Sequence, residues 1–475
     1  MTTDAAPTDI SDISGISDIS GISRIVAAQR AHFATHATLP LSSRRDALRR
    51  LYDSVRAHET DIADALASDL GKSPAESYTT ETGLVLSEIR HLSRHLSSWA
   101  RPHLVPTNLA NSVATCRTLR VPYGVALVMS PWNYPVLLAL EPLAGAIAAG
   151  NCCVVKPSTQ SPATSEVIAR ICAECFDPAY VAVTNGGRDE RAALLDERFD
   201  CIFFTGSAAV GRHVMAKAAE NLTPVTLELG GKSPAIVCAD ANLEVAAARI
   251  AFGKYLNCGQ TCVAPDYVLV DESVHDEFLS RLIAQIEKMY GSDPLANPEW
   301  GRIVSERHFE RISSLIDSSE LAYGGRTSRE TLQIEPTVLD RVQPGDLSMQ
   351  EEIFGPVLPV LTYSTLDEAE TFVTDRPTPL ALYVFTSSRA TERRFVRRVP
   401  FGGGCVNDTV VHLATPHLPF GGMGASGMGA YHGRRSFEAF THEKGVMKKW
   451  VWPDLPMRYA PSRPWKQKLI RLFLR

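Results

Sequence analysis

The strongest constraint on the fold is a regular alternation of short apolar runs and helix-like runs between Tyr123 and Glu220. Each apolar run is short and is bounded by Gly, Pro, Ser or Asn, which is typical of a buried strand. Strands that alternate with helices predict a parallel sheet with helical crossovers, as in nucleotide-binding α/β folds. The expected strands are "YGVALVMSPW", "NCCVVKPS", "YVAVTNG" and "DCIFFTGS", and the expected helices are Pro135–Ala149, Pro162–Cys175, "RDERAALLDE" and Ala209–Glu220.

The rest of the chain divides around this region. A chain of 475 residues, 45% of them hydrophobic, is long enough for two or three domains. Before the alternation, apolar residues recur at helical spacing, and after it "TPVTLELGGKSPAIV" leads into a second α/β region. The expected segments are a disordered low-complexity tail at 1–23, a dinucleotide-binding domain at 24–229 with a connector or arm at 102–118, a second α/β domain at 230–423, a glycine-rich segment at 424–450 and a basic amphipathic tail at 451–475.

Composition excludes several classes of protein. The net charge of −5 gives no basic excess for nucleic acid, so we expect no nucleic-acid partner. Ten cysteines in a chain this long are too few for a disulfide scaffold and favour reduced thiols in a cytoplasmic protein. The apolar run Pro135–Val155 has the length of a membrane span, but Glu141 and Pro142 interrupt it, so a buried helix followed by a buried strand is expected.

A set of motifs occurs in a fixed order along the chain: "PWNYP", "KPS", "FTGSAAVG", "LELGGKSP", "NCGQTC", "MQEEIFGPVLP" and "LPFGGMGASGMGAYHG". Ordered agreement of several motifs is far more specific than any one of them. With these motifs the chain resembles the NAD(P)-dependent aldehyde dehydrogenases over roughly Arg24 to Lys449. "NCGQTC", "NDTVVH" and "GAYHGRRSFEAFTH" are most similar to class 3, the fatty and aromatic aldehyde dehydrogenase branch. The resemblance implies that 230–423 is a catalytic domain and that 424–450 serves oligomerisation or the mouth of a substrate tunnel.

Cys258 and Cys262 stand four residues apart in "NCGQTC". By themselves they could be a metal pair, a disulfide, two core residues, or one nucleophile with a bystander. A zinc site would need two more ligands, and no nearby His or Cys pair supplies them, so we expect no metal. The resemblance implies that Cys262 is the nucleophile, because a thiolate adds readily to a carbonyl carbon and the resulting thioester is easily hydrolysed. Cys258 is then expected to be a packing residue; because residues four apart on a helix share a face, it could also form a reversible bond with Cys262 under oxidation.

The resemblance assigns two more catalytic roles. Asn133 in "PWNYP" matches the amide that, with the Cys262 backbone N–H, stabilises an oxyanion. Glu228 in "LELGG" matches the general base that activates water. A carboxylate within an otherwise apolar run should be desolvated, which would raise its pKa toward neutrality.

The resemblance implies cofactor contacts at three places, with NAD or NADP as the cofactor. "FFTGSAAVG" predicts a strand-to-helix turn suited to a pyrophosphate, although it is not the common G-x-G-x-x-G fingerprint. Thr159 stands where the family commonly carries a glutamate for the ribose 2′-hydroxyl, which favours use of NADP. The expected cofactor-binding residues are Lys156, Ser158, Thr159, Gly206, Ser207, Gly211, Glu352 and Phe354.

Substrate and partners are less constrained. Tyr134, Phe252 and Leu256 flank the catalytic motifs and would give a substrate tunnel apolar walls, so we expect an aliphatic or aromatic aldehyde to be oxidised to its acid. The alternatives are a cofactor-independent thiol esterase or acyltransferase, and a catalytically silent binding protein. Class 3 relatives imply a homodimer. The stretch 465–475 has the pattern of a basic amphipathic helix, which suits docking on its own protein or contact with a membrane surface.

Overall fold

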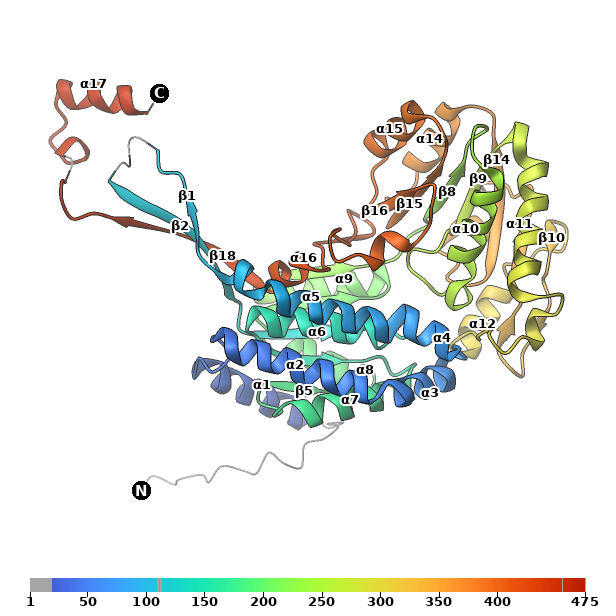
Figure 1. The fold of residues 1–475 in the computed structure, drawn as a ribbon, viewed down its shortest axis with the longest axis horizontal. Coiled ribbons are helices and arrows are strands. Elements are labelled where there is room, and N and C mark those ends of the chain that lie inside the picture. The colour runs from blue at the N-terminus through green and yellow to red at the C-terminus, as the bar shows by residue number, and fades with distance from the viewer. Residues whose placement is uncertain (1–18, 109–110, 112, 455, 475) are drawn as a thin grey trace.

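The computed structural model describes residues 19–108, 111, 113–454 and 456–474. Two lobes, each built around a parallel β-sheet, lie side by side, and a long arm projects from the first lobe (Figure 1). The α/β fold class expected from the sequence is confirmed.

The first lobe contains a six-stranded sheet in the order β17-β7-β6-β3-β4-β5. Its strands run parallel except for β17, which pairs antiparallel with β7 at the edge. Every residue of β3, β4, β5 and β6 is buried, as expected for a sheet covered on both faces. The strands are β3 (Val125–Met129), β4 (Cys152–Lys156), β5 (Val181–Val183), β6 (Cys201–Thr205), β7 (Val225–Glu228) and β17 (Gly427–Met428).

The predicted alternation therefore forms this sheet, and its crossover helices fall close to the predicted ranges. The earlier helices pack beside them through the predicted apolar stripe, because Leu48, Leu51, Val55, Ile62 and Leu66 are all fully buried. The helices of this lobe are α1 (Ile19–Ala34), α2 (Leu41–Ala57), α3 (Glu59–Leu70), α4 (Pro74–Ser77), the π-helical turn η1 (Tyr78–Thr82), α5 (Gly83–Ala100), α6 (Leu137–Ala149), α7 (Pro162–Cys175), α8 (Arg188–Asp196), α9 (Ala208–Glu220) and α16 (Arg434–Ala439).

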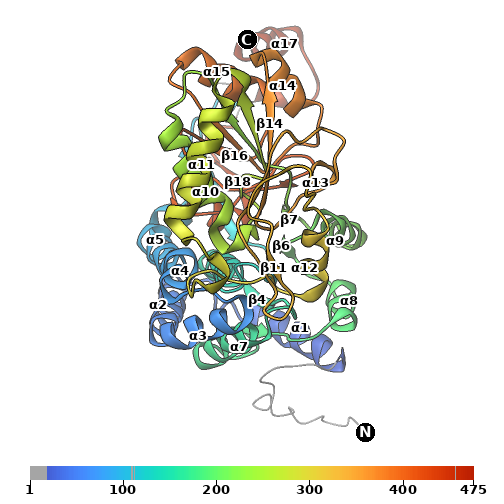
Figure 2. The ribbon, with the colours of Figure 1, turned by 90° about the vertical axis from the view of Figure 1, so that its right-hand side faces the viewer.

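The second lobe contains a seven-stranded sheet in the order β10-β13-β14-β9-β8-β15-β16. Every pair of neighbouring strands in this sheet is parallel except the pair β10–β13, which is antiparallel. Its strands are β8 (Pro234–Val237), β9 (Tyr267–Asp271), β10 (Leu321–Tyr323), β13 (Thr337–Leu339), β14 (Val357–Tyr363), β15 (Ala381–Phe385) and β16 (Gly403–Val406), with a small ribbon of β11 (Thr327–Ser328) and β12 (Gln333–Ile334). Its helices are α10 (Leu243–Tyr255), α11 (His275–Tyr290), α12 (Glu306–Ser313), α13 (Leu347–Gln350), α14 (Leu366–Thr374) and α15 (Arg389–Arg398), with short 3₁₀ turns η3 (Leu256–Gly259) and η6 (Val411–Ala414). In the view turned by 90°, the second lobe, with α10, α11 and α14, lies above α2, α3 and α7 of the first lobe (Figure 2).

The arm is a three-stranded antiparallel sheet in the order β1-β2-β18. The strands are β1 (His103–Val105), β2 (Ala114–Pro122) and β18 (Thr441–Lys449), so the predicted connector supplies two strands and the C-terminal region supplies the third. Beyond β18 the chain continues to a terminal helix, α17 (Pro464–Phe473), at the tip of the arm (Figure 1).

Two expected boundaries are wrong. The tail was expected to extend to residue 23, but α1 begins at Ile19, because Ile22 and Ile25 are buried against the first sheet; residues 1–18 of that tail lie outside the described residues. The segment 424–450 is not one unit, since β17 and α16 pack with the first lobe while β18 belongs to the arm. Within the described part of the chain, no helix combines the length and apolar character that crossing a bilayer would require.

Candidate active site

A cavity of about 300 Å³ lies where loops of the second lobe meet the carboxyl ends of strands from the first. Ligands of open α/β sheets bind at this end of the strands. The side chains that the sequence singled out as Asn133, Glu228, Cys262, Glu352 and Phe354 all line it. The full lining comprises Pro131, Trp132, Asn133, Leu138, Thr205, Gly206, Ser207, Glu228, Leu229, Gly230, Cys262, His308, Arg311, Glu351, Glu352 and Phe354.

Cys262 is presented by an irregular loop and not by a helix. The 3₁₀ turn η3 contains Asn257 and Cys258 with positive φ angles of 52° and 52°, which end the regular helical path before Cys262. The shared helical face expected for Cys258 and Cys262 is therefore absent, whereas the prediction that Cys258 is a packing residue is confirmed by its burial. Cys258 is buried and its Sγ packs toward Gly301, whereas Cys262 is partly exposed in the cavity wall. All ten cysteines are free thiols.

Glu228 is the last residue of β7 and enters the cavity beside Cys262. Its side chain is almost completely buried, and neither carboxylate oxygen has a well-formed hydrogen bond to a described residue. Burial raises the pKa of Glu228 to about 7, and the nearby Cys262 thiol partly opposes that rise. Burial also raises the pKa of the Cys262 thiol well above its usual value, with help from the Glu228 and Glu352 carboxylates. The expected upward shift of the Glu228 pKa is confirmed, and a neutral thiol faces a group able to take its proton.

A hydrogen bond fixes the side chain of Asn133. Its Nδ2 donates a hydrogen bond to the Gln260 carbonyl oxygen at 3.0 Å, two residues before Cys262. An amide nitrogen carries two protons, so one N–H is fixed on the Cys262 loop and the second is available to another acceptor. Asn133 itself lines the cavity. A preorganised donor of this kind is what oxyanion stabilisation requires.

The carboxyl edge of the first sheet has the character of a ligand site. Ser207 caps the N-terminus of α9, and with Gly206 it lines the cavity, which gives a diphosphate a helix N-terminus to bind. Buried side-chain oxygens without a hydrogen-bond partner among the described residues gather at this edge, at Ser130, Thr184, Asn185, Thr205 and Glu228. Buried polar atoms are normally paired, so their concentration here fits a bound polar cofactor.

The other predicted cofactor residues lie at the same edge or across the cavity. Lys156 ends β4, and Ser158 and the exposed Thr159 follow it, while Gly211 lies inside α9 against Leu229. Phe354 lines the cavity with φ at 50° and places its ring edge-on to Trp132, with the centroids 5.4 Å apart. Desolvation, together with the Asp266 charge, raises the pKa of Glu352 to about 8.

The three predicted tunnel residues do not line this cavity. Tyr134 is buried and its hydroxyl is 2.5 Å from Thr261 Oγ1, Leu256 is half-buried, and Phe252 is 44% exposed. Conversely, the sequence reasoning missed Trp132, His308 and Arg311, which all line the cavity. Trp132 stood inside the quoted "PWNYP" motif, but His308 and Arg311 belong to α12, and nothing in the local sequence of α12 connects it with the site.

Comparison with known proteins identifies the family to which the chain belongs. Residues 10–446 match the profile of the aldehyde dehydrogenase family. The chain belongs to the aldehyde dehydrogenase family. It is 46% identical to the 4,4′-diaponeurosporen-aldehyde dehydrogenase of Staphylococcus aureus over 94% of this chain and 97% of that protein. It is 44% identical to the dimeric NADP-preferring aldehyde dehydrogenase of Mus musculus over 92% of this chain and 97% of that protein.

Solved structures agree with this assignment. The substrate-bound state of Staphylococcus aureus AldH superposes with a TM-score of 0.94 at 44% identity, covering 96% of this chain and 99% of that one. An indole-3-acetaldehyde dehydrogenase in complex with NAD⁺ superposes with a TM-score of 0.84 at 29% identity, over 91% and 90% of the two chains. The aldehyde dehydrogenase described here is thus a class 3-like oxidoreductase that oxidises an aldehyde with NAD or NADP. The esterase and silent-protein alternatives are not favoured.

Proposed function

We propose that this aldehyde dehydrogenase oxidises apolar aldehydes to carboxylic acids through a covalent thioester on Cys262. The observation that carries the proposal is that Cys262, Glu228 and Asn133 come from three separate segments of the sequence and line one cavity. An aldehyde carbon bound there would meet a nucleophile, a base and an oxyanion donor together, which is the arrangement that acyl chemistry requires.

The roles follow from the chemistry of each side chain. Glu228, with its pKa near 7, takes the Cys262 proton, and the sulfur bonds to the aldehyde carbon. The second N–H of the Asn133 amide and the Cys262 backbone N–H stabilise the resulting alkoxide. The nicotinamide of NAD(P) supplies the acceptor for the hydride that leaves this carbon. After releasing the thiol proton to solvent, Glu228 takes a proton from water, and the resulting hydroxide attacks the thioester. The carboxylic acid leaves, and the Cys262 thiolate recovers a proton from the protonated Glu228.

Cofactor contacts are assigned by position. We infer that Gly206, Ser207 and the start of α9 bind the pyrophosphate, with Gly211 allowing α9 to pack closely on Leu229. Lys156, Ser158 and Thr159 would contact the adenosine ribose at the end of β4. Glu352 and Phe354 would hold the nicotinamide ribose and pack beside the ring. We infer acceptance of NADP from the uncharged Thr159, and the mouse relative is named as NADP-preferring.

An apolar substrate is supported by the surroundings of Cys262. The Tyr134 hydroxyl is 2.5 Å from Thr261 Oγ1, and the Thr261 hydroxyl donates to the backbone carbonyl oxygen of Leu256. Both residues therefore lie close to the residue before the nucleophile, and we infer that they form one wall of a tunnel, with the exposed Phe252 nearer its mouth. The Staphylococcus aureus relative is named for diaponeurosporen aldehyde. The test is to measure kcat/KM for aliphatic, aromatic and terpenoid aldehydes with each nicotinamide, beside Cys262→Ala. Preference for a charged semialdehyde, or turnover without nicotinamide, would contradict the proposal.

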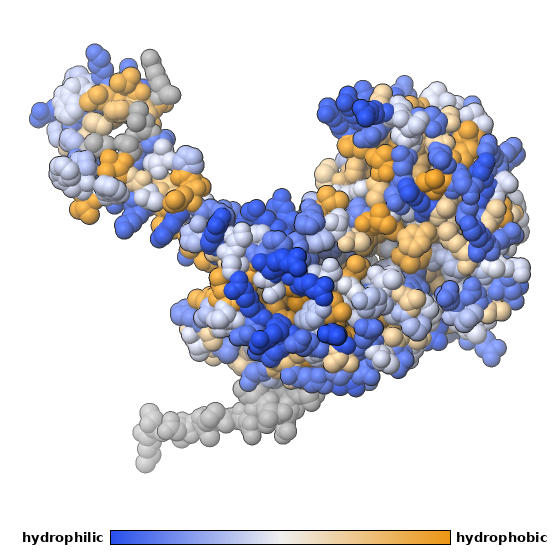
Figure 3. Space-filling view, in the orientation of Figure 1, coloured by the Kyte–Doolittle hydropathy of each residue, from blue (hydrophilic) through white to orange (hydrophobic). Residues whose placement is uncertain are grey.

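We also propose that the arm mediates formation of a homodimer. The arm stands clear of both lobes and carries exposed apolar side chains, which the space-filling view shows in orange near its tip (Figure 3). Val451 is 95% exposed and Trp452 82% exposed, and exposed apolar groups of this size mark an interaction surface. Light scattering of the full chain and of a Trp452→Ser variant tests this; a monomeric full chain would contradict it.

Peripheral contact with a membrane is a separate proposal for 465–475. Within α17, Trp465 and Leu472 are exposed, whereas Lys466 is buried and its Nζ donates to the carbonyl oxygens of Tyr459 and Pro461. Apolar residues beside basic ones suit an anionic lipid surface. Flotation with anionic and neutral vesicles, comparing the full chain with a variant ending at Arg463, measures the effect. Equal flotation of both forms would reject the contact.

A further inference from the structure

A buried ion pair lies directly behind the oxyanion donor. Lys72 Nζ is 2.5 Å from Glu81 Oε1, and both side chains are almost fully inaccessible to solvent. Lys72 follows the end of α3, and Glu81 lies in η1, a π-helical turn between α4 and α5. Removing two charges from water is expensive, and π-helical turns are rare and frequently occur at functional sites. Burial of this ion pair at this position therefore suggests a functional role.

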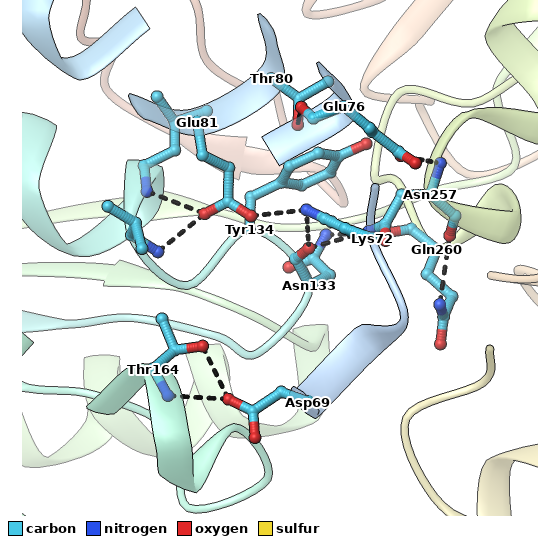
Figure 4. Close-up of polar contacts among 12 residues, drawn as sticks. Asp69, Lys72, Glu76, Thr80, Glu81, Asn133, Tyr134, Thr164, Asn257 and Gln260 are labelled. Atoms are coloured by element: carbon cyan, nitrogen blue, oxygen red, sulfur yellow. Dashed lines mark hydrogen bonds and ion pairs between the residues drawn. The ribbon is translucent and has the colours of Figure 1, made fainter. Parts of the chain in front are cut away.

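Both members of the pair bind the segment that carries Asn133 (Figure 4). Lys72 Nζ donates to the Asn133 carbonyl oxygen at 3.1 Å and lies 4.0 Å from the centroid of the Tyr134 ring. Glu81 Oε2 accepts from the backbone N–H groups of Val136 at 2.8 Å and Leu137 at 3.2 Å, where α6 begins. The pair thus fixes the residues on either side of the turn that leads from Asn133 into α6.

The same carbonyl oxygen is also held from the second lobe. Asn257 Nδ2 donates to the Asn133 carbonyl oxygen at 2.8 Å and to the Gln260 carbonyl oxygen at 3.2 Å. The Asn257 backbone N–H in turn donates to Glu76 Oε1 at 2.7 Å, and Glu76 belongs to α4. Figure 4 shows the Lys72 side-chain nitrogen between Glu81 and Asn133, and the Glu76 carboxylate next to Asn257. Two donors from different lobes therefore converge on a single carbonyl.

We propose that Lys72 and Glu81, together with Asn257, are positioning residues that hold the Asn133 amide at the distance from Cys262 at which it binds the oxyanion. This inference rests on the proposed role of Asn133. The three side chains touch the backbone around Asn133 and the Gln260 carbonyl, and they do not line the cavity. They act only through Asn133, whose side chain is fixed on the Gln260 carbonyl.

The expected consequence is a loss in kcat with little change in cofactor KM. A shift of the oxyanion donor by a fraction of an ångström weakens a contact made chiefly in the transition state, and misplacements of about 1 Å can cost about 10²-fold. We expect Lys72→Met to lower kcat about 10-fold. Asn257→Gly should lower kcat to a similar extent, because glycine retains the positive φ of residue 257 and removes only the amide.

A double-mutant cycle with Asn133→Ala separates positioning from general destabilisation. Asn133→Ala alone should lower kcat about 10²–10³-fold. If Lys72 acts through Asn133, adding Lys72→Met to Asn133→Ala should lower kcat no further. Full multiplication of the two losses, or an unchanged kcat in Lys72→Met, would overturn the proposal.

The charge left on Glu81 is a risk in Lys72→Met, since an unpaired buried charge can unfold a protein. The double variant Lys72→Met/Glu81→Leu replaces the ion pair by apolar side chains, and such a replacement is often neutral for stability. This double variant is also combined with Asn133→Ala in the same cycle. The matched control is Arg326→Met, which breaks the Arg326–Glu335 ion pair near the small β11–β12 ribbon and should leave kcat unchanged. Rates are normalised to folded enzyme, and melting temperatures are measured for every variant.

The cycle also distinguishes the positioning role of Lys72 from the oxyanion role of Asn133. An unchanged kcat in Asn133→Ala would overturn the oxyanion role itself and with it this inference. A large loss in Asn133→Ala combined with independent effects of Lys72→Met would overturn only the positioning role and would leave the proposed function standing.

Discussion

The Asn133 side chain donates a 3.0 Å hydrogen bond to the carbonyl oxygen of Gln260, and so binds a loop of the first lobe to the loop that carries Cys262 in the second. These residues are 127 positions apart in the chain. The contact couples the geometry of the candidate oxyanion donor to that of the candidate nucleophile. Any movement between the lobes would change the distance on which stabilisation of the alkoxide depends.

The two cysteines of the "NCGQTC" motif should respond differently to substitution. Cys262→Ala should lower aldehyde oxidation more than roughly 10³-fold, because Cys262 is the sole thiol among the described residues that line the cavity. Cys258→Ala should retain most activity and lose some stability, since Cys258 packs in the core at 3% exposure. NAD(P)H formation and thermal unfolding, measured on both variants, check this. Loss of turnover in Cys258→Ala without unfolding would contradict the assignment.

Hydrolysis of the thioester should depend on pH through Glu228. Glu228 acts as a base only when deprotonated, and burial raises its pKa to about 7. The hydrolytic rate should therefore be low below pH 7, rise as pH passes through about 7, and level off above it. Glu228→Gln should slow this step about 10²-fold or more and remove the inflection. The measurement is the decay of an isolated acyl-enzyme; the same inflection in Glu228→Gln would assign it to another group.

Gly230 should be required for the position of Glu352. A Cβ on Gly230 would collide with the Glu352 carboxylate, so Gly230→Ala must displace that side chain. We expect a cofactor KM raised roughly 10-fold, as for loss of about 1.4 kcal/mol of binding. Gly445→Ala is the matched control, because its position on β18 leaves open space for a Cβ among the described residues. Equal cofactor affinities in the two variants would argue against a role for Glu352 in binding.

The choice between nicotinamides should depend on position 159. Thr159→Glu places a carboxylate at an exposed site after β4, where it would bind a ribose 2′-hydroxyl and repel a 2′-phosphate. The ratio of kcat/KM for NADP to that for NAD should fall about 10-fold or more. Gln160→Glu, on the neighbouring exposed residue, adds the same charge and should change the ratio much less. A similar fall in both variants would indicate only a general electrostatic effect.

The first sheet is predictable from the sequence because its signal is local. The strands β3 to β6 are short apolar runs bounded by turn residues, and every residue in them is buried. The start of α1 was missed because Ile22 follows a repetitive polar stretch and becomes core only by packing on a distant sheet. The helix assumed around Cys262 failed because positive φ angles at Asn257 and Cys258 are supported by contacts with remote residues, such as Glu76.

The sequence by itself determined the chemical groups and their order: an amide at 133, a carboxylate at 228 and a thiol at 262, embedded in motifs that identify the family. Only the tertiary structure decided that Lys72 and Glu81 lie behind that amide, that His308 and Arg311 line the cavity, and that β18 joins the arm. The physical reason is the range of the interactions. Turn residues and apolar periodicity act between neighbours in the chain, whereas burial of a charge pair and closure of a cavity depend on segments brought together by folding.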